Sequence, residues 1–181
     1  RLAGKARHVR LAHQLREHAA LVARGDGERL AVESGARLRA VHELSRHAQV
    51  FVSAEGNVPE ELRVHRLDIA PEQMHDALYY AHLLLGESGT MATEAACMGT
   101  PAVRCDPFAQ SALERGCFIA LEGEYGLMFN FNSSNQRQAL EKALELVQQD
   151  VKPLWQEKRA RLLRDTIDMT AMIVWLVENY P

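Results

Sequence analysis

Residues 83–94 combine the residue types that bind a phosphate group. Three leucines, a glycine and Glu87 are followed by Ser88, Gly89 and Thr90, and an alanine-rich segment with helical character comes next. A short turn between a buried strand and a helix leaves the first N–H groups of the helix without partners, and the helix dipole favours an anion there. Ser88, Gly89 and Thr90 are therefore candidate phosphate-binding residues.

Glu94 lies six residues after Ser88 on the same expected helix. A carboxylate there could accept hydrogen bonds from the two hydroxyls of a ribose, as an acidic residue does in dinucleotide sites, although at a different spacing. The alternative is that Ser88 is an ordinary helix N-cap and Glu94 an exposed helix residue. The pattern matches neither a Walker loop nor GxGxxG. The residues alone leave both interpretations open.

Two further side chains could act as a general acid or base. His75 lies at the start of the helix before the turn, and histidine has an ordinary pKa of about 6.5. Glu55 follows an expected strand at 50–52 and would lie at the same edge of a parallel sheet. The alternatives are a packed or capping histidine and a loop without a role in chemistry. No catalytic residue is assigned.

The elements that would position these residues alternate along the chain. We expect strands at 50–52, 62–67, 83–85, 101–105 and 118–120, and helices at 34–47, 71–81, 88–98, 109–116, 136–149 and 152–180. The last helix is either long or broken, with Asp168 as a cap. Apolar strands between helices are typical of a parallel sheet covered on both faces. We therefore expect an α/β fold with a doubly wound, Rossmann-like parallel sheet and extra N- and C-terminal helices.

The N-terminal part differs in charge from the rest of the chain. Residues 1–50 contain 10 Lys and Arg against 5 Asp and Glu, whereas the whole chain has a net charge of −3. Helical spacing of apolar residues predicts a helix at 2–24. The segment lacks aromatic residues and nucleic-acid motifs, so we expect solvated helix faces, which could dock on an acidic partner surface, rather than a nucleic-acid-binding arm. Because the chain begins with Arg1, we expect it to be a piece of a longer protein.

Several sequence blocks resemble those of known proteins. ESGTMATEAA at 87–96 and GTPAVR at 99–104 are similar to the nucleotide-sugar half of GT-B proteins, notably UDP-N-acetylglucosamine 2-epimerases and related glycosyltransferases. Together with HDALYYA at 75–81, YGLMFNF at 125–131 and WLVENYP at 175–181, they resemble the uncharacterised prokaryotic GT-B-like family known as domain of unknown function 354. The resemblance covers about residues 36–181 and implies the C-terminal half of a GT-B fold.

The resemblance implies roles for individual residues. Ser88 and Gly89 would contact a diphosphate, with Thr90 in place of a second glycine, and Glu94 would bind the ribose hydroxyls. Arg104 stands where the epimerases often carry an arginine, and the resemblance makes it a further candidate ligand-binding residue. Two departures from the epimerases, Glu87 in place of an aspartate and a different stretch at 106–110, argue against epimerase chemistry.

Gln110 has a possible counterpart outside the epimerases. Some glycosyltransferases of this fold use a glutamine to contact sugar hydroxyls, and the resemblance places Gln110 in that role.

These implications define two functional hypotheses. In the first, residues 1–35 form a basic helical segment, and 36–181 form a Rossmann-like domain that binds a nucleotide-diphosphate sugar, specifically a UDP-sugar. Any activity would be glycosyltransferase-like or epimerase-like, and the isolated chain would lack the other catalytic half. The alternative is a non-catalytic interaction or dimerisation module.

Composition limits the remaining possibilities. Cys97, Cys105 and Cys117 are odd in number and form no CxxC pair, so we expect neither a disulfide framework nor a zinc site, and a cytoplasmic location. The apolar run at 171–177 is far shorter than the roughly 20 residues of a membrane helix. We expect no membrane span, metal or cofactor. The expected partners are the nucleotide sugar and either a second copy or the missing N-terminal GT-B half.

Overall fold

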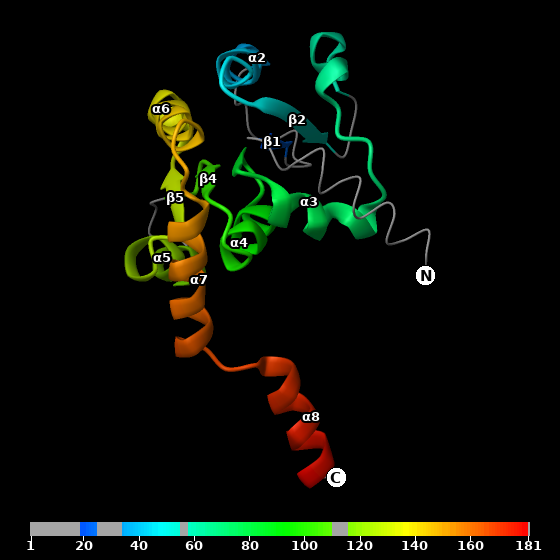
Figure 1. Ribbon diagram of the computed structural model, residues 1–181, viewed down its shortest axis with the longest axis vertical. Coiled ribbons are helices and arrows are strands. Elements are labelled where there is room, and N and C mark those ends of the chain that lie inside the picture. Colours follow the sequence, from blue (N-terminus) through cyan, green and yellow to red (C-terminus); the bar gives the residue numbers. More distant parts are fainter. Residues whose placement is uncertain (1–18, 25–33, 55–57, 110–115, 181) are drawn as a thin grey trace.

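Five parallel strands form a single sheet in the computed structural model, which describes residues 19–24, 34–54, 58–109 and 116–180 (Figure 1). Their spatial order is β2-β1-β3-β4-β5. The strands are β1 (Ala19–Arg24), β2 (Gln49–Ala54), β3 (Leu83–Gly86), β4 (Ala102–Cys105) and β5 (Met128–Phe131). All four pairings are parallel, so every strand ends at the same edge of the sheet.

Helices cover both faces of this sheet. The α-helices are α2 (Ser34–Leu44), α3 (Met74–Tyr80), α4 (Gly89–Cys97), α5 (Gly116–Ile119), α6 (Gln136–Val147), α7 (Lys152–Asp165) and α8 (Met169–Asn179). Shorter helical turns are η1 (Glu60–His65), η2 (Pro71–Gln73), the π-helix η3 (Ala120–Glu124) and η4 (Ser133–Asn135). Helices α2 and α6 contact each other on one face, and α3 and α4 contact each other on the other (Figure 1).

Burial on both faces explains the apolar strands. Leu83, Leu84 and Leu85 of β3 are all buried, as are all four residues of β4. A parallel sheet covered by helices buries both sides of its strands, which favours continuous apolar runs. The expected α/β class with a doubly wound parallel sheet is confirmed.

The helix expected at 2–24 is wrong at its C-terminal end. Residues 19–24 form β1, which pairs with both β2 and β3 and is therefore an interior strand. A short apolar run is compatible with either a helix or a strand, and here pairing with the two neighbouring strands makes it a strand. The sheet thus includes residues that the sequence assigned to the 1–35 segment. Residues 1–18 lie outside the described part of the chain.

Two expected strands are also wrong. Residues 60–65 form the 3₁₀-helix η1, in which Leu62 is buried but Val64 is 85% exposed, and only Arg66 makes a bridge to Val52. Residues 118–120 belong to α5 and η3, and the fifth strand is β5, for which we expected no element. Of the helix expected at 109–116, residues 110–115 lie outside the described range.

The C-terminal helix is broken, as one of the two expected forms had it. The Asp168 side chain accepts a hydrogen bond from the backbone N–H of Ala171 at 3.0 Å and caps α8. Helix α8 extends away from the sheet (Figure 1), and none of its residues is buried. No helix in the described part of the chain is both long enough and apolar enough to span a membrane.

Helix α7 packs on the body of the domain through a buried tryptophan. The Trp155 indole N–H donates to the Leu127 carbonyl at 2.8 Å just before β5 begins. Gln156 donates to the carbonyls of Met98 and Gly99 after α4. These contacts connect α7 to the amino edge of the sheet, opposite the ends at which ligands of such folds bind.

We expect Trp155→Phe to destabilise the protein by about 1–3 kcal/mol, because the buried Leu127 carbonyl loses its donor. Trp155→Ala should cost about 3–5 kcal/mol, since it also leaves a cavity. Urea unfolding measures both values. The control is Leu154→Ala, at a neighbouring residue that is 50% exposed, which should change stability by less than about 0.5 kcal/mol. Equal losses at Trp155 and Leu154 would contradict the packing described here.

Candidate functional site

The turn at residues 86–90 lies where the connections of the sheet change direction. In the order β2-β1-β3-β4-β5 this switch point falls between β1 and β3, and ligands of open α/β sheets bind outside the carboxyl ends of the strands there. Strand β3 ends at Gly86, and α4 begins at Gly89. The predicted phosphate-binding turn therefore occupies the edge of the sheet at which this fold binds ligands.

Ser88 is the N-cap of α4. Its Oγ accepts a hydrogen bond from the backbone N–H of Met91 at 3.3 Å. Thr93 donates through its hydroxyl to the Gly89 carbonyl at 2.9 Å, within the same first turns. Ser88 and Gly89 are half-buried and Thr90 is exposed. Ser88 therefore caps α4, as the alternative interpretation had it. The end of the helix remains accessible to solvent at Thr90.

Gly89 is required by the packing beneath the turn. A Cβ atom at this position would lie 2.8 Å from Cζ of Phe118 and 3.7 Å from Nε of Arg104. The first distance is far below van der Waals contact, and Phe118 is a buried ring. The absence of a side chain at Gly89 therefore has a structural cause, independent of any ligand.

Arg104 is buried below this turn rather than on its solvent side. The residue is 4% exposed, and its guanidinium carbon lies 3.9 Å from the centroid of the Phe118 ring. Nη1 donates to Oδ1 of Asn130 at 3.0 Å, and Nη2 lies 3.2 Å from a carboxylate oxygen of Asp106. Arg104 is therefore placed to support the turn from below.

The residues that hold Arg104 were not predicted from the sequence. Phe118 lies in a stretch expected to be a strand, and Asn130 lies in an unassigned one. Glu122 in turn holds Asn130, by accepting hydrogen bonds from its backbone N–H at 2.8 Å and its side-chain amide at 2.9 Å. The one available signal was the presence of a polar residue, Asn130, in an otherwise apolar strand.

Two candidates from neighbouring helices meet beside the turn. His75 of α3 and Glu94 of α4 bring Nε2 and Oε1 to 3.5 Å, because these two helices pack against each other. Both side chains reach solvent, with 65% exposure for His75 and 35% for Glu94. The structure thus joins the candidate acid or base with the candidate ribose-binding carboxylate. The remaining candidates, Glu55 and Gln110, lie outside the described residues.

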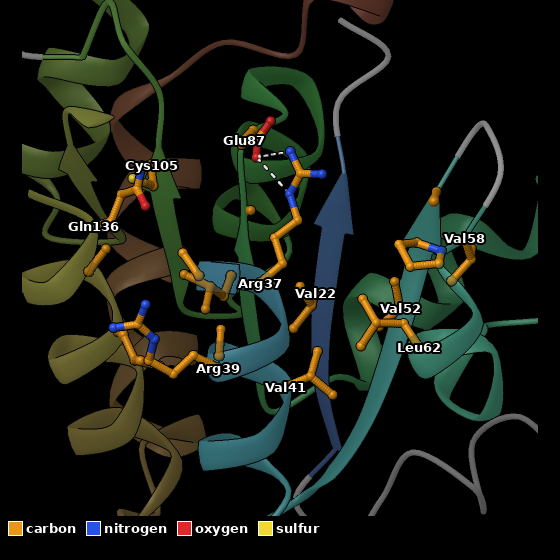
Figure 2. A pocket seen from close by; sticks show the side chains of 18 of the residues that line it. Val22, Arg37, Arg39, Val41, Val52, Val58, Leu62, Glu87, Cys105 and Gln136 are labelled. Atoms are coloured by element: carbon orange, nitrogen blue, oxygen red, sulfur yellow. Dashed lines mark hydrogen bonds and ion pairs between the residues drawn. The ribbon is translucent and has the colours of Figure 1, made fainter. Parts of the chain in front are cut away.

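Glu87 points to the other face of the sheet. Its Oε1 accepts hydrogen bonds from Nη2 of Arg37 at 2.9 Å and from Nε at 3.3 Å, and both side chains are mostly buried. Glu87 and Gly86 line a cavity under α2 that includes none of Ser88, Gly89 and Thr90 (Figure 2). Within the described ranges, no three His, Cys, Asp or Glu side chains are grouped closely enough to hold a metal ion.

Cys105 ends β4 at the same edge and is buried. Burial, together with the nearby carboxylates of Glu87 and Asp106, raises the pKa of its thiol to about 11. Its sulfur lies 3.6 Å from the Asn132 carbonyl. Cys97 and Cys117 are exposed. A thiol that stays protonated at neutral pH is a poor nucleophile, so the geometry assigns Cys105 to packing.

Comparison with known proteins identifies the fold. No protein-family model matches the sequence, and no curated protein is similar to it in sequence. Two solved GT-B glycosyltransferases share the fold, each with a TM-score of 0.55. The glycotransferase of kitacinnamycin is 15% identical over 81% of this chain, and the spinosyn forosaminyltransferase is 16% identical over 94%. The chain spans 38% and 46% of the length of these two proteins and has the fold of one part of a GT-B glycosyltransferase.

We expect Gly89→Ala to destabilise the protein by about 1–3 kcal/mol, because the new methyl group overlaps the Phe118 ring. Phe118→Leu should partly relieve this overlap, so the double variant should be more stable than the sum of the two single effects predicts, by about 0.5–3 kcal/mol. Denaturant unfolding of the four proteins gives this coupling energy. Strict additivity would show that the two residues do not touch.

We expect the two exposed thiols, Cys97 and Cys117, to react with a disulfide reagent such as Ellman's reagent at pH 8 in the folded protein, Cys97 more slowly because burial raises the pKa of its thiol. Cys105 should react only on unfolding, because its thiol is buried and its pKa is raised to about 11. The stoichiometry with and without denaturant measures this difference. Cys105→Ala serves as the control and should leave the reaction of the folded protein unchanged.

Proposed function

We propose that this chain binds a nucleoside-diphosphate sugar, linked to UDP, at the carboxyl edge of its sheet. The observation that carries the proposal is the position of the α4 N-terminus, which begins at the β1/β3 switch point with Glu94 further along the same helix. At 1.5 Å per residue, the six residues from Ser88 to Glu94 separate the two positions by about 9 Å along the axis. A diphosphate at one and a ribose at the other would both face this helix.

Each residue has a distinct role in the proposed complex. Backbone N–H groups at Gly89 and Thr90 donate to the diphosphate, and the helix dipole favours its charge. The Glu94 carboxylate accepts hydrogen bonds from the ribose hydroxyls, and His75 at 3.5 Å orients that carboxylate. Arg104 places a buried positive charge beneath the turn and acts as a positioning residue.

In this proposal, the chain is the nucleotide-sugar half of a GT-B-like glycosyltransferase. The motif at 87–96 and the fold shared with GT-B glycosyltransferases support this assignment. No family model supports the expected membership of domain of unknown function 354. In GT-B enzymes the acceptor and often the catalytic base come from the other half, so the isolated chain binds its ligand without turnover. The departures at 87 and 106–110 argue against an epimerase. Gln110 remains a candidate for the sugar hydroxyls on the resemblance alone.

One observation favours an interaction module as a second function. Helix α8 exposes a continuous set of apolar side chains, each about half exposed or more: Met169, Met172, Ile173, Val174, Trp175, Leu176, Val177 and, just beyond it, Tyr180. An exposed apolar surface of this kind marks an interaction site. It is compatible with nucleotide-sugar binding, because α8 extends away from the carboxyl edge.

A thermal-shift titration against UDP, UDP-N-acetylglucosamine, other nucleotide sugars, NAD and ATP tests the proposal. Ligand at 100 times its Kd should stabilise the fold by about 2.7 kcal/mol, or roughly 5–10 °C at this size. We expect UDP compounds to give the shift, and Glu94→Ala to remove it. The matched control, Glu157→Ala on α7, alters an exposed glutamate beyond the other end of α4 and should retain it.

Ser88→Asp distinguishes a loss of ligand binding from a loss of stability. Aspartate caps a helix as well as serine does, so stability should be preserved, whereas its charge repels a phosphate. We expect this variant to lose the UDP-dependent shift. The proposal is wrong if no nucleotide produces a shift at millimolar concentration, or if the shift survives in both Glu94→Ala and Ser88→Asp.

A further inference from the structure

A cavity of about 340 Å³ lies inside the α2/α6 face of the sheet. Val22, Val52 and Leu85 form its floor at one level of three neighbouring strands, because Val22 is in register with both of the others. Val41 of α2 and Leu62 of η1 also line it (Figure 2). All five side chains are buried. Arg39, Pro59 and Arg137, which are exposed, also line the cavity, so it has an apolar interior that opens to solvent.

Small residues on the covering helices create this space. Ala36 and Ala40 are four residues apart on α2, share one face of that helix, and both line the cavity. Ala139 of α6 is buried and lines another wall. A leucine at any of these positions would occupy part of the volume. The cavity is thus present because the residues at these helix–sheet contacts are small.

The size of the cavity indicates the size of its occupant. Protein interiors are close-packed and contain few voids larger than a water molecule. A cavity of roughly 150 Å³ with apolar walls already binds benzene, and ligand pockets start at about 300 Å³. A volume of about 340 Å³ is therefore sufficient for an apolar group of about a dozen carbon atoms.

Charged side chains line the cavity, and two of them, Arg37 and Glu87, lie at the carboxyl edge. Arg37 extends from α2 to Glu87, directly after β3, as Figure 2 shows. Arg39 and Arg137 also line the cavity, and Arg137 is paired with Glu141 at the surface. Three guanidinium groups thus accompany two carboxylates. This excess favours an anionic ligand. Arg37 uses N–H groups of Nε and Nη2 to bind Glu87, and a guanidinium has five N–H donors, so others remain for a carboxylate or phosphate.

We propose that this cavity binds an amphipathic anion, with its carboxylate or phosphate group at Arg37 and its aliphatic chain between α2 and the sheet. Glu87 holds the Arg37 guanidinium at the end of the cavity, and this guanidinium binds the head group of the ligand. The site does not include Ser88, Gly89 or Glu94. It adjoins the proposed nucleotide-sugar site through Gly86 and Glu87 but uses different ligand-binding residues.

Isothermal titration calorimetry with dodecanoate, dodecyl phosphate and dodecanol tests this proposal, with each probe kept below its micellar concentration. We expect both anions to bind with one site per chain. Dodecanol should bind at least about tenfold more weakly, because it lacks the charged hydrogen bond to Arg37. The tighter of the two anions identifies the head group as carboxylate or phosphate. Equal affinity for dodecanol would overturn the anionic part of the proposal.

Ala40→Leu fills the cavity and is the decisive variant. We expect dodecanoate affinity to fall at least about tenfold while the thermal unfolding midpoint stays or rises, as in cavity-filling substitutions. Ala36→Leu provides a second filling variant if the first does not fold. Ala160→Leu, on an exposed face of α7, is the matched control and should bind normally.

Helix α8 is the competing site for an aliphatic chain, and the filling variants leave it unaltered. Dodecanoate binding that is unchanged in both Ala40→Leu and Ala36→Leu would assign the binding to such a surface and overturn the proposal. The proposal is also overturned if neither dodecanoate nor dodecyl phosphate binds the native chain. Neither result bears on the nucleotide titration, which uses other residues and another ligand.

Discussion

A fully parallel sheet has no face that remains in water, and the other features of this domain depend on that constraint. Each crossover must return over the sheet, so helices cover both faces and all strands end at one edge. Polar residues that follow the strands are thereby gathered at this edge, among them Glu87, Ser88 and Asp106. The N-terminus of α4 faces solvent there because its apolar side is buried against β3 and β4. The site is thus a direct product of the sheet's topology.

The one charged side chain among the buried residues described connects this edge to the core. Burying a guanidinium is costly unless hydrogen bonds and a counter-charge compensate for lost hydration. For Arg104, Asn130 supplies a hydrogen bond, Asp106 supplies the charge, and the Phe118 ring supplies a cation–π contact. These partners come from β5, the end of β4, and α5. The turn at Gly89 rests on this cluster, so its shape is determined by residues that no ligand needs to touch.

The predictable parts of the molecule are those whose determinants are contiguous in sequence. The β3–turn–α4 unit could be located to within about two residues, since an apolar run, an N-cap and a helical pattern follow one another directly. Strand β1 could not, because its short apolar run becomes a strand only through pairing with β2 and β3. The hydrogen bond between Arg104 and Asn130 could not be predicted from the sequence either. These residues meet because they are in register on β4 and β5, which is a property of the assembled sheet.

Helix α8 has a different physical status from the rest of the domain. It comprises 11 residues, none of them buried, and isolated helices shorter than about 12–15 residues are marginal in water. Its apolar side chains gain little from the sheet, so packing against the domain contributes little to its stability. Segments with few buried contacts open at a lower free energy than the core. We therefore expect α8 to unfold at a lower free energy than the sheet, as a separate unit.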